Sequence, residues 1–171
     1  MKEITFQNDV LPLKNILFRL ALRITQNRVE AEDVVQETMM KVWNRRTEWP
    51  QIQSMEAFCL TICRNLSLDK LRRMDNQLRS EGAPPADLLE TAVSGNPEEQ
   101  AVQRDRVALV RQLMSQLPEK QRSCMQLRDI EGKAYKDIAD ILGMTEQQVK
   151  TNIFRARQTI KERFLKIDSD A

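Results

Sequence analysis

The chain has 171 residues, of which 41% are hydrophobic and 30% are charged, and its formal net charge is +2. This length allows one or two domains with apolar cores. The absence of histidine removes the commonest general base and metal ligand, which argues against an enzyme. No run approaches the ~20 apolar residues of a membrane span, and the first residues lack a signal peptide's apolar core. We therefore expect a cytoplasmic protein.

Low glycine and aromatic content and long helical periodicities predict an all-α protein. The three cysteines, Cys59, Cys63 and Cys124, are too few for a disulfide framework. Without histidine or a second close cysteine pair, they are expected to be buried free thiols. The sequence therefore predicts no catalytic residue, no metal site and no cofactor.

The first expected helix runs from about Val10 to Ile24, and a second from about Val29 to Arg46. The predicted core face of the second helix is Val34, Val35, Met39, Val42 and Trp43. Its first turns carry four carboxylates and no cation: Glu30, Glu32, Asp33 and Glu37. The helix dipole accounts for the first two carboxylates. Asp33, Gln36 and Glu37 extend the polar strip further, which suits docking to a basic partner.

A polar segment, Thr47 to Met55, contains Pro50 and ends with Ser54 as a predicted N-cap. The third helix is expected from Met55 to about Met74, with Phe58, Ile62 and Leu66 facing inward. A basic helix beside an exposed tryptophan loop is typical of single-strand nucleic-acid sites. Trp49 fits that site, but it fits a packing role equally well, and both interpretations stay open.

Residues 76–95 break the helical pattern with prolines, glycines and small residues, and residues 76–104 sum to a charge of −3. We expect a flexible linker, able to span up to ~65 Å at ~3.3 Å per residue. A second domain then starts at Asn96-Pro97, a good helix N-terminus.

The segment from Tyr135 to Arg157 predicts a helix-turn-helix. Gly143 ends its first helix, and Thr145 with Gln148 forms a capping box for the second. Ala134, by contrast, cannot cap the first helix, at a cost of ~1 kcal/mol. The predicted buried face of the second helix is Val149, Ile153, Ala156 and Ile160. Its opposite face is polar, and residues 150–166 carry a net charge of +5, which favours a DNA-reading helix.

Three stretches in this order closely resemble the extracytoplasmic-function class of bacterial RNA polymerase sigma factors. EAEDVVQETMMKVW (30–43) resembles the core-polymerase-binding helix, and AFCLTICRNLSLDKLRR (57–73) the segment that recognises and opens the minus-ten element. Residues 117–164 resemble the minus-thirty-five-binding domain.

The resemblance implies an all-α fold with a three-helix domain (1–75), a flexible acidic linker (76–95) and a four-helix domain (96–171). Core-polymerase binding falls on Asp33, Gln36 and Glu37. Minus-ten binding falls on Trp49, Gln51, Gln53, Met55, Asn65, Asp69, Arg72 and Arg73. Minus-thirty-five binding falls on Gln147, Gln148, Lys150, Thr151, Phe154, Arg155 and Arg157.

The implied function is to bind core RNA polymerase, direct it to promoter DNA and start melting, with capture of the non-template strand. The resemblance also implies an anti-sigma partner, which is often anchored in a membrane. Two alternatives rest on the residues alone. A stand-alone helix-turn-helix regulator leaves residues 30–43 and 57–73 unexplained, and a purely protein-binding helical module leaves the basic helix unexplained.

Overall fold

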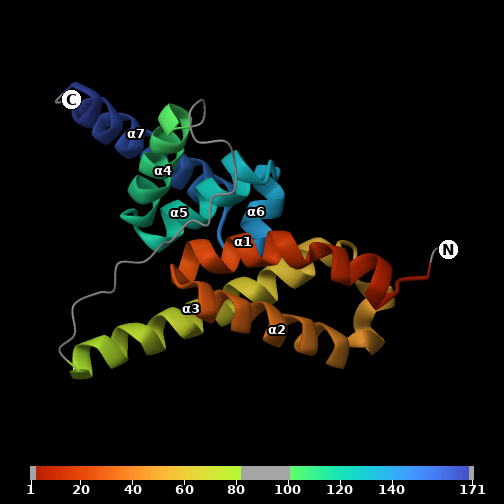
Figure 1. Ribbon diagram of the computed structural model, residues 1–171. Helices are drawn as coiled ribbons and strands as arrows, with labels where there is room; N and C mark the ends of the chain where they lie inside the picture. Colours follow the sequence, from red (N-terminus) through yellow and green to blue (C-terminus); the bar gives the residue numbers. More distant parts are fainter. Residues whose placement is uncertain (1–2, 82–100, 170–171) are drawn as a thin grey trace.

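The computed structural model describes residues 3–81 and 101–169, which form helices and turns without any strand. The first domain contains three long helices, α1 (Lys14–Thr25), α2 (Arg28–Asn44) and α3 (Met55–Glu81), with short helical turns at Phe6–Val10, Leu11–Leu13 and Arg46–Gln51. The second contains α4 (Ala101–Ser115), α5 (Glu119–Met125) with its continuation Gln126–Ile130, α6 (Tyr135–Leu142) and α7 (Glu146–Ser169). Figure 1 shows the two groups of helices lying against each other. The all-α prediction with two helical domains is confirmed.

The helix α3 continues to Glu81, past its expected end near Met74. Residues 76–81, predicted to begin the linker, are therefore helical. The remainder of the predicted linker and the predicted helix start at Asn96-Pro97 lie outside the described residues.

The first domain is organised around α1, whose side chains Leu17, Leu20 and Ile24 are completely buried between α2 and α3. The helix ends where Gln26 adopts a left-handed conformation, with φ of 55°. Asn27 then starts α2 as its N-cap, because its Oδ1 accepts a hydrogen bond from the backbone N–H of Glu30 at 3.0 Å. This tight connection places α1 and α2 side by side.

The two tryptophans of this domain differ in exposure. Trp43, predicted to face the core, is 47% exposed, and that prediction is wrong; Trp49 is only 6% exposed, which agrees with the packing interpretation of the two that the sequence left open. The reason is the short helical turn after α2, which folds Trp49 back so that its indole N–H donates to the carbonyl of Val42 at 3.1 Å. Trp43 then packs edge-on between Phe6 and Trp49 at the surface.

The buried surface of α3 is broader than the predicted stripe. Leu66 is buried as expected, but Phe58 and Ile62 are only half-buried, and Cys59, Leu60 and Cys63 lie deepest. This happens because α3 packs against α1 and α2 on one side and against α6 of the second domain on another. The prediction of buried free thiols is confirmed for Cys59, Cys63 and Cys124, and burial raises the pKa of each to about 12.

The second domain packs α4, α5 and α6 around α7. The predicted buried face of α7 is confirmed, since Val149, Ile153, Ala156 and Ile160 are all buried. Ala156 and Ile160 lie in a cluster with Leu113, Met114 and Leu117, at the end of α7 away from the turn. The other end of α7, with α6, joins the core of the first domain.

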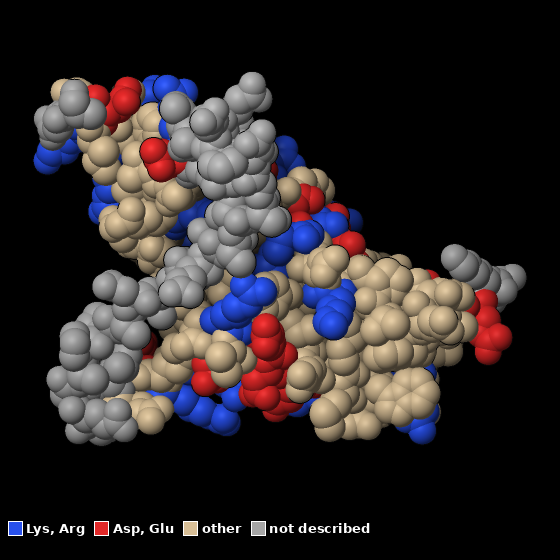
Figure 2. Space-filling model, viewed as in Figure 1, with Lys and Arg blue, Asp and Glu red and all other residues tan. Residues whose placement is uncertain are grey.

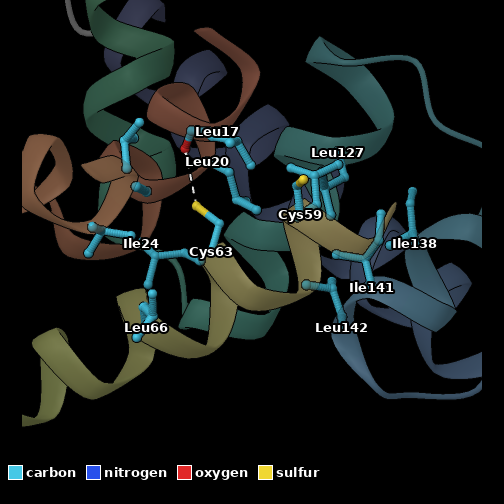
Figure 3. Close-up of a cluster of buried hydrophobic side chains, with 14 of the residues drawn as sticks. Leu17, Leu20, Ile24, Cys59, Cys63, Leu66, Leu127, Ile138, Ile141 and Leu142 are labelled. Carbon is cyan, nitrogen blue, oxygen red and sulfur yellow. Dashed lines mark hydrogen bonds between the residues drawn. The ribbon is translucent and has the colours of Figure 1, made fainter. Parts of the chain in front are cut away.

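A single apolar cluster runs through both domains. Figure 3 shows α3 side chains such as Cys59 directed toward Leu127 of the second domain, with Ile138, Ile141 and Leu142 of α6 close by. The two domains are thus held in a closed arrangement with a shared core.

Candidate functional site

The turn of the helix-turn-helix has the predicted geometry. Gly143 ends α6 at φ 64°, in the left-handed region that favours glycine. Thr145 and Gln148 form the capping box: the N–H of Gln148 donates to Thr145 Oγ1 at 3.1 Å, and the N–H of Thr145 donates to Gln148 Oε1 at 2.9 Å. Ala134, as predicted, makes no side-chain cap for α6. The turn therefore sets the start of α7 independently of any ligand.

Replacing Thr145 with alanine should destabilise the domain by about 1 kcal/mol, because one N-terminal N–H of α7 loses its acceptor. Thermal unfolding followed by circular dichroism measures the change. Thr145→Ser keeps the hydroxyl and should retain most of the stability. An equal loss for serine and alanine would mean that the methyl group of Thr145, rather than its cap, matters.

The exposed face of α7 gathers the predicted minus-thirty-five residues. Six of the seven are exposed and Thr151 is half-buried, and the exposed fraction of Phe154 is 67%. All six cations of the basic stretch are also exposed: Lys150, Arg155, Arg157, Lys161, Arg163 and Lys166. The exposed surface of the helix thus presents amide, hydroxyl and cationic groups, the set used to contact base edges and phosphates.

These residues are not equally available for a ligand. Arg157 is paired with Asp129, with one contact of 3.0 Å between Nε and Oδ2, and this hydrogen bonding raises the pKa of Arg157. The side-chain oxygen of Gln148 already accepts the backbone hydrogen bond of the capping box. Lys150 lies over the ring of Tyr135, 5.6 Å from its centroid. Among the described residues, none pairs with the Arg155 guanidinium, so Arg155 is the readiest donor of the face.

A cavity of about 380 Å³ opens between α2 and α3. Two predicted minus-ten residues, Asn65 and Asp69, line it together with Lys41, Asn44 and Arg45 at the end of α2. The latter three were not singled out from the sequence. Their spacing of three and four residues, which puts them on one face of a helix, is the signal that marks them. The cavity combines amide, carboxylate and cationic groups above an apolar floor of Ile62 and Leu66.

The other predicted minus-ten residues do not line this cavity. Arg72 and Arg73 are exposed on α3, and Arg72 donates to Asp69 at 2.7 Å. In the loop, Gln51 and Gln53 are exposed and Met55 is half-buried. Trp49 does not belong to this surface, because its ring is buried. The exposed ring nearby is Trp43, over which the Arg46 guanidinium lies at 4.6 Å from the centroid.

The acidic strip of α2 is partly neutralised within its own domain. Asp33 and Gln36 are exposed and Glu37 is half-buried. Lys70 of α3 contacts Asp33 at 2.5 Å and Glu30 at 3.5 Å, and the hydrogen bond to Asp33 raises the pKa of Lys70. Figure 2 shows acidic and basic side chains lying next to each other on this domain. A basic partner on this strip would therefore compete with Lys70 for Asp33.

Within residues 3–81 and 101–169, no group of three or more Cys, Asp or Glu side chains is arranged to hold a metal ion. None of the helices in these ranges is long and apolar enough to cross a bilayer.

Two family models match the chain. Residues 10–77 match "Sigma-70 region 2" and residues 108–160 match "Sigma-70, region 4". The relatives include "ECF RNA polymerase sigma factor SigE" of Mycolicibacterium smegmatis, 32% identical, covering 90% of this chain and 59% of the relative. "ECF RNA polymerase sigma factor SigL" of Mycobacterium tuberculosis is 30% identical and covers 85% of this chain and 81% of the relative. "Probable RNA polymerase sigma factor RfaY" of Xanthomonas campestris is 31% identical, but the chain spans only 39% of its length.

Solved structures give the same result for the fold. The sigma factor RpoE, crystallised with the anti-sigma factor NepR from Bartonella quintana, superposes with a TM-score of 0.76 at 25% identity, covering 95% of this chain and 98% of RpoE. CnrH, solved with the cytosolic domain of CnrY, superposes at 0.66 and 20% identity over 97% of this chain and 89% of its own, and supports the fold alone. With both sigma regions in order on one chain, this protein belongs to the extracytoplasmic-function sigma factors.

Proposed function

We propose that this protein binds core RNA polymerase and directs it to a specific set of promoters, where it recognises both elements and starts melting. The observation that carries the proposal is the pairing of sigma-70 region 2 with an exposed, cationic recognition helix in region 4. The chain contributes binding and orientation, and the polymerase supplies the catalysis. Its place of action is the cytoplasm, where polymerase and chromosomal DNA meet.

We assign the functional units to residues 1–75, 76–95 and 96–171, with polymerase and minus-ten binding in the first and minus-thirty-five binding in the last. The linker between them joins two DNA-binding units on one chain. Because residues 76–81 belong to α3, the 14 residues 82–95 could span at most ~46 Å at ~3.3 Å per residue, which still exceeds one duplex turn (~34 Å).

In the minus-thirty-five interaction, α7 enters the major groove with its N-terminal residues toward the bases. Gln147, Lys150, Thr151, Phe154 and Arg155 form the reading surface, while Gln148 and Arg157 flank it. Because six exposed cations line the same helix, phosphate contacts provide most of the non-specific affinity. Binding should therefore weaken steeply as salt rises, as counterion release requires.

In the minus-ten interaction, the cavity between α2 and α3 is the site for an unstacked base of the non-template strand. Its volume of about 380 Å³ and its Asn65 and Asp69 side chains suit a single polar base. In this proposal, the strand continues along Arg72 and Arg73 of α3 and along the loop residues Gln51, Gln53 and Met55. Trp49 supports this surface from beneath by packing under the loop.

Polymerase binding uses the acidic strip of α2. Replacing Asp33 with lysine should weaken binding to purified core polymerase at least about tenfold, because like charges across an interface are strongly unfavourable. Surface plasmon resonance at constant salt measures this effect. Asp168→Lys, an identical charge reversal at the far end of α7, is the control and should bind like the parent. Equal loss for both variants would move the contact away from α2.

Run-off transcription with purified core polymerase on genomic promoter fragments tests the whole function. Discrete transcripts that depend on this protein are the expected result, and alignment of their start sites would give both promoter elements. A stand-alone helix-turn-helix regulator is the second candidate, favoured only by the exposed basic face of α7. It would bind DNA without binding core polymerase and would yield no transcripts.

We also propose an anti-sigma factor as a physiological partner. The support is indirect: the similar structures of RpoE and CnrH were solved with the anti-sigma factor NepR and with the cytosolic domain of CnrY, respectively. Co-purification from the source cell under conditions that do not induce the regulon tests this proposal.

A further inference from the structure

Arg122 of α5 reaches out of its own domain to the end of α1. Its side chain is almost fully buried, with an exposed fraction of 7%. Nη2 donates to the carbonyl of Ile24 at 2.9 Å and Nε to that of Arg23 at 3.0 Å, while Nη1 donates to Leu117 at 2.8 Å. The last carbonyls of a helix lack partners within the helix and attract cations. Arg122 therefore caps α1 from the other domain.

Arg64 of α3 makes the reciprocal contact. Its Nη1 donates to the carbonyl of Leu142, the last residue of α6, at 2.9 Å. Each domain thus supplies an arginine that satisfies the C-terminal end of a helix in the other. If the domains separate, Arg64 loses its carbonyl acceptor and Arg122 keeps only Leu117, so both helix ends would have to be solvated by water.

A chain of polar side chains lies beside the Arg122 cap on α1. Arg23 donates to Gln126 Oε1 at 2.9 Å, and Gln126 donates to Glu131 at 2.9 Å. Glu131 in turn accepts two hydrogen bonds of 2.8 Å from Arg19. Burial beside other arginines lowers the pKa of Arg23 to about 10, so Arg23 remains a cation at neutral pH. This network adds directional contacts between α1 and the second domain.

Apolar contacts complete the interface. Cys59 of α3 is completely buried, and Figure 3 shows its sulfur directed toward Leu127 of the second domain. Cys63, one turn further along α3, is covered from within its own domain instead, since its thiol donates to the carbonyl of Leu17 in α1 at 3.3 Å. Separation of the domains would uncover Cys59 and leave Cys63 buried.

We propose that the reciprocal caps of Arg122 and Arg64 form a latch that keeps the free protein closed, and that opening of this latch exposes Cys59. The closed arrangement also brings α3 against the edge of the recognition helix: Arg64, Gln148 and Asn152 line one cavity of about 360 Å³. If the proposed function is correct, the polymerase must supply the free energy that opens the latch before both DNA surfaces act together.

Residue-resolved thiol labelling on the isolated protein tests the latch without DNA or polymerase. Native protein is exposed to a small alkylating reagent, and mass spectrometry follows Cys59 and Cys63 separately. The variant Arg122→Met keeps the apolar stem and removes the donors. We expect at least about tenfold faster labelling of Cys59 and an unchanged rate for Cys63, because hydrogen bonds from a charged donor are the strong ones.

Two further variants make the result decisive. Arg64→Met removes the cap from the opposite domain and should give the same selective increase at Cys59. Arg28→Met is the control, because Arg28 contacts Glu32 and lies over the ring of Phe18, both within the first domain, and should leave Cys59 protected. Unchanged Cys59 labelling in both latch variants, or equal acceleration of Cys59 and Cys63, would overturn the proposal.

The outcome is separable from that of the proposed function. Selective labelling of Cys59 with failed run-off transcription would leave the latch standing and remove the sigma role. Normal transcription without selective labelling of Cys59 would keep the sigma role and overturn the latch.

Discussion

Replacing Trp49 with alanine is expected to lower the free energy of unfolding by about 3–5 kcal/mol, the usual loss for a buried tryptophan. The side chain is only 6% exposed, and its indole N–H donates to the carbonyl of Val42. The substitution therefore leaves a cavity beneath the loop and removes one of the two hydrogen bonds that the carbonyl of Val42 accepts, the other coming from the backbone N–H of Arg45 at 3.2 Å. Urea unfolding monitored by far-ultraviolet circular dichroism gives the change.

Trp43 provides the control for this measurement. It is 47% exposed and contacts Phe6 and Trp49 edge-on at centroid distances of 5.8 and 6.1 Å. Its loss should cost only about 1 kcal/mol, the scale of aromatic pair contacts. Comparable losses for the two variants, or a larger one for Trp43→Ala, would contradict the packing described for this loop.

Replacing Arg155 with alanine should weaken binding to a minus-thirty-five duplex by roughly 5- to 150-fold, the range that a base contact of about 1–3 kcal/mol provides. Arg155 is exposed one helical turn beyond Thr151, on the same face of α7. Unlike Arg157, which would have to give up Asp129 to contact DNA, it is ready to donate. Fluorescence anisotropy at constant salt, with the duplex defined by the run-off experiment, measures the loss.

Lys166→Ala removes the same charge from the same helix, eleven residues further along and therefore roughly 16 Å away. It should reduce affinity slightly and by the same factor on a scrambled duplex, since it acts through phosphates alone. The Arg155 variant should lose more on the cognate duplex than on the scrambled one. An equal loss on both duplexes would limit Arg155 to phosphate contact.

The helix-turn-helix was predictable because its determinants are local. Gly143, Thr145 and Gln148 lie within six residues, and the conformation of each follows from its own chemistry. The buried face of α7 follows equally from the spacing of its apolar residues. For the same reason, the exposed position of most predicted DNA-binding residues on α7 and α3 could be anticipated, and their roles stay predictions until binding is measured.

The tryptophans and the domain interface were not predictable in this way. Helical periodicity predicted Trp43 on the core face of α2, but Trp43 is 47% exposed, and a six-residue turn after the helix buries Trp49 instead. The reciprocal caps join atoms far apart in sequence, since Arg122 and Ile24 are 98 residues apart. No local sequence pattern predicts a hydrogen-bond acceptor that lies so far along the chain. The cations of the interface consequently look like ordinary solvated residues in the sequence.

The shared core has a consequence for synthesis on the ribosome. The first domain is complete once α3 has emerged, but the side of α3 around Cys59 gains its cover only when Leu127 and α6 follow. Roughly 75 residues separate Leu66 from Leu142, which takes about 4–15 s at about 5–20 residues per second. During that interval the nascent chain displays an apolar stripe, so the order of translation gives chaperones a defined period in which to bind it.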